Sequence, residues 1–146
     1  MNYTRIVVAA VAATIVDAVY GFVVYGNLLT AQFSAYPGVY RAPATQGAYM
    51  PILFAGIFIA MLAASFIYAK GYEGGSGAAE GLRFGIVLGL VAVGYSALVS
   101  YSILNIGRRL GVSMTCASLV EWIVAGLVIG LTYKPAVAGA RQRAAV

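Results

Sequence analysis

The stretch IVVAAVAATIVDAVYGFVVY, residues Ile6–Tyr25, decides how the rest of the sequence is interpreted. Its residues are mostly apolar, and its only charged side chain is Asp17. About twenty helical residues, at ~1.5 Å each, cross the roughly 30 Å hydrocarbon core of a membrane. The stretch therefore predicts a transmembrane helix. It also raises the question of what compensates a carboxyl group near its middle, because a charge at that depth costs several kcal/mol.

The composition of the whole chain supports a membrane environment. Of its 146 residues, 62% are hydrophobic and only 9% are charged, and the mean hydropathy is +0.92. Soluble domains carry about 25% charged residues, so this chain has too few charges to cover a water-exposed surface. We expect the lipid bilayer to be its main solvent.

Four apolar spans follow one another along the chain, and none alternates as a membrane strand would. We place them at about residues 6–25, 51–68, 84–104 and 112–133. The first could also be a cleaved signal peptide, but Asp17 interrupts it and no clear cleavage site follows, so we expect it to be retained. The prediction is an all-α integral membrane four-helix bundle in one domain, residues 1–134, with an outer loop at 27–50 and a basic cytoplasmic tail at 135–146.

The basic residues indicate the orientation. If the N-terminus is inside, six basic residues lie on the cytoplasmic side and three on the other, which favours cytoplasmic N- and C-termini. The cytoplasmic set is Arg5, Lys70, Arg83, Lys134, Arg141 and Arg143, and the outer set is Arg41, Arg108 and Arg109. This pattern fits a multi-pass protein of a prokaryotic plasma (inner) membrane.

Several function classes are disfavoured by missing residue types. The chain has no histidine and a single cysteine, Cys116, so an internal disulfide, a histidine-bearing zinc site and a Ser–His or Cys–His catalytic pair are excluded. We expect no cofactor, no metal, no enzymatic activity, and Cys116 as an inert buried thiol. The basic residues stand apart at segment ends, which speaks against nucleic-acid binding.

The two main connections differ in character. GGSG, residues Gly74–Gly77, predicts a flexible linker, followed by Glu80, which we expect to pair with Arg83 at the surface. The outer loop carries YPGVYRAP, residues Tyr36–Pro43. Its proline, glycine and tyrosine content predicts either an ordered cap over the bundle or a contact for another protein.

Small residues recur every four positions on three spans, a spacing that lets helix backbones approach closely in membranes. On the first span they form a stripe with Asp17. On the other two they are candidate helix-packing residues, within this chain or with a neighbouring one: Gly81, Gly85, Gly89, Gly126 and Gly130.

A second acid is predicted to lie at the depth of Asp17. Asp17 is twelve residues after Arg5, and Glu121 is thirteen residues before Lys134 on a helix of opposite direction. Tyr95, twelve residues after Arg83, shares that level, and Tyr20 lies one turn from Asp17. Two nearby carboxyl groups in a dry bundle cannot both ionise cheaply. The candidate proton or ion site is therefore Asp17, Glu121, Tyr95 and Tyr20. The alternatives are that each acid is a hydrogen-bonded packing element, or that Glu121 faces a water-filled vestibule.

In plan the chain resembles small four-span bacterial membrane proteins of unknown function. The resemblance rests on GSGAAEGLRFGIVLGL (Gly75–Leu90) and EWIVAGLVIG (Glu121–Gly130), and it brings no assigned activity. The sequence favours a non-catalytic accessory or scaffold subunit that packs against other membrane chains or against itself. The alternative is a small proton-coupled transporter or ion-conducting oligomer that uses the membrane-embedded carboxylates.

Overall fold

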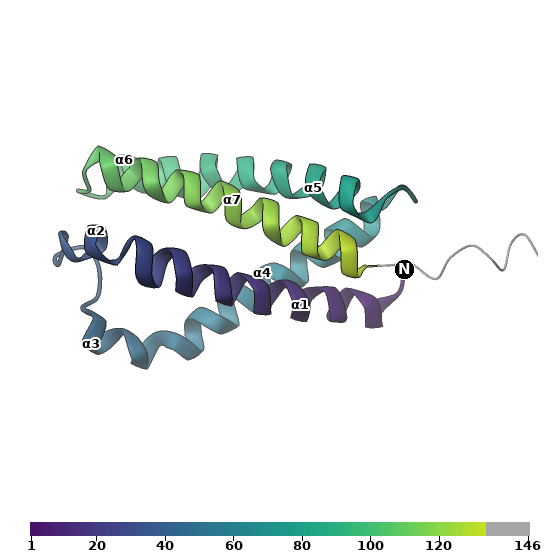
Figure 1. Cartoon of the computed structure of the whole chain (residues 1–146), viewed down its shortest axis with the longest axis horizontal. Helices are drawn as coiled ribbons and strands as arrows, with labels where there is room; N and C mark the ends of the chain where they lie inside the picture. The colour runs from purple at the N-terminus through teal and green to yellow at the C-terminus, as the bar shows by residue number, and fades with distance from the viewer. Residues whose placement is uncertain (134–146) are drawn as a thin grey trace, which may run out of the picture.

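The computed structural model describes residues 1–133, and all of their regular structure is helical (Figure 1). The elements, in chain order, are α1 (Tyr3–Val23), the π-helix η1 (Val24–Leu28), α2 (Thr30–Ser34), α3 (Pro43–Gln46), the 3₁₀ turn η2 (Gly47–Tyr49), α4 (Met50–Gly71), α5 (Gly77–Val91), the π-helix η3 (Ala92–Leu98), α6 (Val99–Ile103) and α7 (Arg108–Thr132). The predicted all-helical fold is confirmed. The predicted tail, 135–146, and Lys134 lie outside the described residues.

Four continuous helical stretches are long and apolar enough to cross a membrane, as predicted. They cover Tyr3–Leu28, Pro43–Gly71, Gly77–Ile103 and Arg108–Thr132. The predicted spans fall on these stretches, and only the last residue of the third and of the fourth span extends past the observed helix. The observed helices begin three to eight residues earlier than the predicted spans because the sequence estimate followed the apolar core and left out polar end turns.

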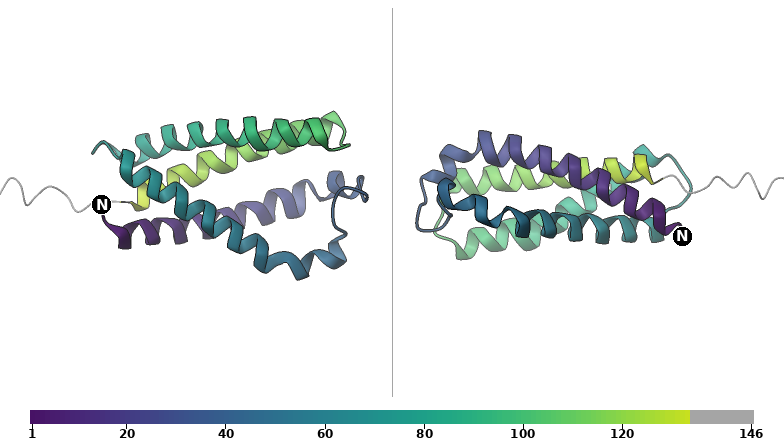
Figure 2. Two further views of the ribbon diagram at one scale, coloured as in Figure 1. Left: turned by 180° about the vertical axis from the view of Figure 1, so that it is seen from behind. Right: turned by 90° about the horizontal axis from the view of Figure 1, so that it is seen from below.

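The four stretches form two antiparallel pairs, α1 with α4 and α5 with α7, and the pairs meet where α1 contacts α7 (Figures 1 and 2). α5 packs along α7, and α1 contacts both α4 and α7. α4 crosses α1 and diverges from it toward α3. We call the end of the bundle that holds the start of α1 the N-terminal end, and the end that holds α2, α3 and α6 the opposite end.

The core lies toward the N-terminal end, where alanines allow α1, α4 and α7 to approach. Ala9, Ala10 and Ala13 are fully buried and pack with Met61 and Ile129. Four aromatic rings close this end, with centroid distances of 5.3–6.0 Å between neighbours; they belong to Tyr68, Tyr72, Phe84 and Tyr133. Such edge-on packing of aromatic rings stabilises a contact beyond the area buried.

The five predicted packing glycines lie at the contact of α5 with α7. A Cβ on Gly81 would stand 2.5 Å from the carbonyl oxygen of Gly126, and one on Gly85 would stand 2.6 Å from that of Trp122. Gly130 faces the backbone of Gly77 and Gly81 just as closely. The two helices therefore touch backbone to backbone, which no larger residue permits at these positions.

The outer loop folds over the start of α7. The N–H of Gly107 donates to the Tyr36 hydroxyl at 2.9 Å, and the Tyr40 hydroxyl lies 3.4 Å from the sulfur of Met114. The ring of Phe33 packs edge-on against Tyr40 at 4.8 Å. These contacts make the loop an ordered cap on its own helices, the first of the two predicted roles; a contact with another protein stays a prediction.

Two expectations about single side chains are wrong. Glu80 is only 8% exposed, and its carboxylate accepts hydrogen bonds from the backbone N–H groups of Glu73 and Gly75 instead of pairing with Arg83. The loop bends back over the first turn of α5 and brings these amides to the carboxylate, with Gly74 at φ 90°. Cys116 is exposed on the outside of α7 rather than buried.

Candidate functional site

Asp17 lies on the face of α1 that packs into the bundle, and its side chain is 6% exposed. It continues the stripe of small residues that begins with the buried Ala9 and Ala13. Residues four apart share one face of an α-helix, so the alanines that bring α1 close to its neighbours also carry the carboxyl group inside. The position of Asp17 therefore follows from helix periodicity alone.

Glu121 on α7 lies near Asp17, close enough for the two carboxyl groups to interact. A hydrogen bond between two carboxyl groups needs one of them to be protonated, because an ionised carboxylate has no donor. No cation among residues 1–133 accompanies the two acids. The two acids therefore form a pair in which one proton can be shared.

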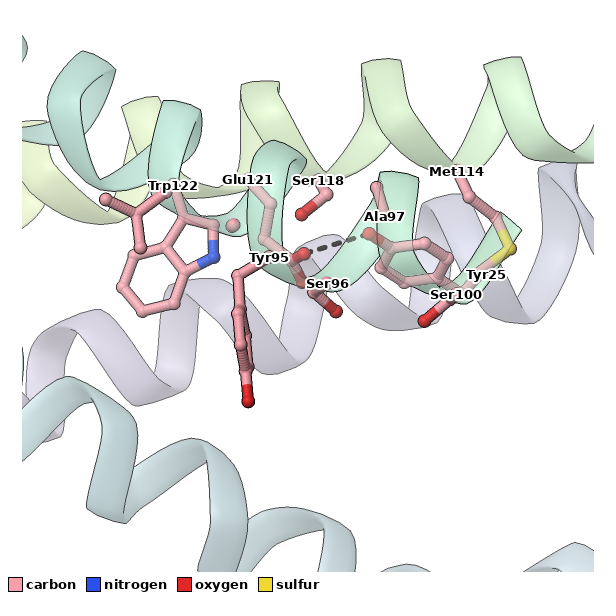
Figure 3. A pocket seen from close by; sticks show the side chains of 11 residues that line it. Tyr25, Tyr95, Ser96, Ala97, Ser100, Met114, Ser118, Glu121 and Trp122 are labelled. Atoms are coloured by element: carbon pink, nitrogen blue, oxygen red, sulfur yellow. Dashed lines mark hydrogen bonds between the residues drawn. The ribbon is translucent and has the colours of Figure 1, made fainter. Parts of the chain in front are cut away.

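Tyr25 completes the pair on the other side of Glu121. Its hydroxyl donates to Oε2 of Glu121 at 2.9 Å, drawn as the dashed line in Figure 3. A hydroxyl donor to a carboxylate stabilises the ionised form, so the bond from Tyr25 makes a negative charge on Glu121 less costly.

Tyr20 lies near the acids but bonds elsewhere. Its hydroxyl donates to the carbonyl oxygen of Ala117 at 2.8 Å, one turn before Glu121 on α7. The bond ties α1 to α7 beside the carboxyl pair. In this geometry Tyr20 positions α1 against α7 beside the candidate site.

Tyr95 lines the same cavity as Glu121, but it makes no hydrogen bond with either acid in the described part of the chain. Its side chain is 82% exposed, and in Figure 3 its hydroxyl points away from the bond between Tyr25 and Glu121. On an unbroken α-helix Tyr95 would share the inward face of Leu88, seven residues earlier. The π-helix η3 (Ala92–Leu98) has wider turns, which shift that register. The sequence predicted the depth of Tyr95 and made no prediction of the side of the helix on which it lies.

Sequence reasoning missed Tyr25 as a site residue because it was placed in the aromatic belt at the membrane surface. Tyr25 lies in the π-helix η1 (Val24–Leu28). The side-chain amide of Asn27 donates to the carbonyl of Phe22 at 2.7 Å, and the Thr30 hydroxyl donates to that of Gly26. These side chains supply partners for carbonyls that the π turn leaves free. Polar residues so close after an apolar span were the available signal.

A cavity of about 460 Å³ lies beside Glu121. Its walls come from η3, α6 and α7, with Tyr25 reaching in from η1 (Figure 3). Glu121 lines this cavity and Asp17 does not. Glu121 thus stands between an open volume and a buried carboxyl group, which is the arrangement a proton needs to pass between them.

Among residues 1–133, no group of three or more histidine, cysteine, aspartate or glutamate side chains is placed to hold a metal ion. Comparison of the chain with protein-family models, with curated proteins and with solved structures finds no match. The carboxyl pair and its cavity are therefore the features of the molecule that indicate a function.

Proposed function

We propose that the chain is a multi-pass membrane protein that exchanges a proton at the Asp17–Glu121 pair, as a small proton-coupled transporter. The observation that carries the proposal is the place of Glu121, between the buried Asp17 and the open cavity. Ionisable side chains inside a membrane are costly and are typical of ion and proton pathways. The pair can release its proton toward the cavity when another cation replaces it.

The path from the pair to the N-terminal end supports an alternating mechanism. That end is filled by the alanine core and the aromatic rings of Tyr68 and Tyr133, each no more than 4% exposed. The pair is therefore reached from the cavity in this conformation and closed toward the other end. A transporter needs such a one-sided opening, because a path open at both ends would conduct freely.

A second candidate, an accessory or scaffold subunit, is favoured by the exposed face of α5 and η3. These elements pack on α7, and Tyr95 presents its hydroxyl outward from an apolar surface. A partner chain or a second copy at this face would supply the hydrogen bond that lipid does not. An ion-conducting oligomer would combine both proposals. In every case we propose that the chain is not an enzyme.

For the setting of this function, we propose the inner membrane of a prokaryote with both termini in the cytoplasm. The proposal depends on the excess of basic residues on one side of the predicted spans. The cavity would then open toward the outer half of the membrane, and the closed N-terminal end would face the cytoplasm.

The test is proton movement in proteoliposomes that contain the purified chain and a trapped pH-sensitive dye. We expect solute-dependent proton movement in the parent protein that is lost in Asp17→Asn and Glu121→Gln. The matched control is Glu73→Gln, which removes an exposed carboxylate in the α4–α5 loop. Equal proton movement in all four proteins, or none in the parent, would contradict the transporter. Recovery of the chain within a larger complex after mild detergent extraction would then support the accessory subunit.

A further inference from the structure

The cavity beside Glu121 has the size and lining of a small-molecule site. Its volume of about 460 Å³ lies within the roughly 300–1,000 Å³ of typical ligand pockets. Its walls combine aromatic rings, aliphatic side chains and a few hydroxyl groups. A small molecule in this volume would contact both α7 and η3.

The charge of the residues that line the cavity favours a cation as its ligand. Among residues 1–133, Glu121 is the only charged residue that lines the cavity, and no lysine or arginine does. With one proton shared between Asp17 and Glu121, the pair carries one negative charge. In surroundings of low polarity this charge attracts a single positive charge strongly, because little water screens it.

The other lining groups suit an ammonium ion with an apolar body. Trp122 and Tyr25 lie on opposite sides of Glu121 in the view of Figure 3, and aromatic faces attract cations. The hydroxyl of Ser118, one turn before Glu121 on α7, adds a hydrogen-bond acceptor. Met114 supplies a flexible apolar wall toward the opposite end, and such a side chain adapts to varied shapes.

We propose that this cavity binds an amphipathic organic amine in its protonated form, with its N–H groups on Glu121 and Ser118 and its apolar body between Trp122 and Met114. The inference rests on the proposed function, since it names the solute that the proton exchanges with. When the ammonium binds, the proton shared by the two carboxyl groups leaves to solvent. One cation replaces another, so the charge of the site is unchanged.

The experiment uses Trp122, the only tryptophan of the chain, as a fluorescent reporter inside the cavity. The purified protein in lipid nanodiscs is titrated with 2-phenylethylamine and with its uncharged isostere, 2-phenylethanol. The third probe is the trimethylated ammonium analogue, which keeps the charge but has no N–H donor. Release of protons is followed in the same titrations with a pH-sensitive dye.

We expect saturable binding of the amine, with release of a proton, at an affinity about tenfold or more above that of the alcohol. The trimethylated analogue should bind more weakly than the amine. Glu121→Gln should lose the preference for the amine, and Glu73→Gln should keep it. Equal affinities for amine and alcohol, or unchanged preference in Glu121→Gln, would overturn the inference.

A second variant tests the cavity even if Glu121→Gln fails to fold. Ser118→Leu keeps both carboxyl groups and fills part of the cavity, so amine binding should weaken while the protein stays monodisperse. If Ser118→Leu binds the amine as the parent does, the cavity is not the site. If no amine binds to the parent but Asp17→Asn still abolishes solute-dependent proton movement, this inference fails and the proposed proton site stands.

Discussion

The two halves of the contact between α5–η3–α6 and α7 are built in opposite ways. In the half near the N-terminal end, glycines on both helices place backbone against backbone. Beyond Gly89 the same two helical stretches enclose the cavity, with Trp122 and Glu121 on α7 facing η3. One pair of helices is thus closed over one half of its length and open over the other.

The difference shows how few residues separate a packed interface from a site. The four-residue glycine repeat of α5 ends at Gly89, where an added Cβ would already meet the side chain of Leu119 at 2.8 Å. The next element, η3, is a π-helix, and an added Cβ on Gly94 would meet nothing within 4 Å. Larger side chains and a change of helical pitch separate the helices, and the space between them exposes Glu121.

The largest loss of stability is expected from an added methyl group in the closed half of the contact between α5 and α7. In Gly126→Ala the new Cβ would meet backbone atoms of Gly81 and Gly85, which cannot turn aside as a side chain can. We expect the free energy of unfolding to fall by about 2–3 kcal/mol, the upper range for an overpacked core. Titration with a denaturing detergent measures it. The control is Gly56→Ala on α4, where a Cβ meets nothing within 4 Å; a similar loss there would contradict a backbone contact specific to α5 and α7.

A smaller loss is expected at the loop that leads into the closed half. Glu80→Ala removes the carboxylate that accepts from the N–H groups of Glu73 and Gly75. We expect a loss of about 1–2 kcal/mol, because hydrogen bonds to a charged acceptor contribute more than neutral ones. Faster backbone hydrogen exchange at Gly75 should accompany it. Glu80→Gln keeps one acceptor oxygen and should lose less; equal losses in both variants would argue against these bonds.

The smallest change in stability is expected from a substitution in the open half, where the helices enclose the cavity. Gly94→Ala adds the same methyl group as Gly126→Ala but into free space, so stability should change by no more than about 0.5 kcal/mol. Thermal unfolding of the two variants in one detergent gives the comparison directly. A loss at Gly94 as large as that at Gly126 would mean that the open half is filled, by lipid or by another chain.

The level of a residue along its helix could be predicted from the sequence, but the side of the helix on which it lies could not. The constant rise of a helix was enough to place Asp17 and Glu121 at one level, and the spacing of the glycines predicted the faces on which α5 and α7 pack closely, though not that they pack against each other. The two π-helices changed the angular register, which turned Tyr95 outward and brought Tyr25 to Glu121. No pattern of apolar residues signals such a turn.

Glu80 illustrates a second limit of sequence reasoning. Its spacing to Arg83 predicted a surface ion pair, but the glycine-rich loop folds back and offers backbone amides to the carboxylate. Backbone partners from a loop depend on how that loop closes, which residue spacing does not reveal. The same holds for Tyr36, which meets Gly107 seventy-one positions later.

The central place of α7 has a consequence for biogenesis. In the described part of the chain, α5 finds its extensive helix contact only in α7, which follows it along the chain. Until the 25 residues of α7 are made, the glycine face of α5 has no partner and Asp17 has no second carboxyl group. Synthesis of α7 therefore completes the α5 contact and the acidic pair in the same step.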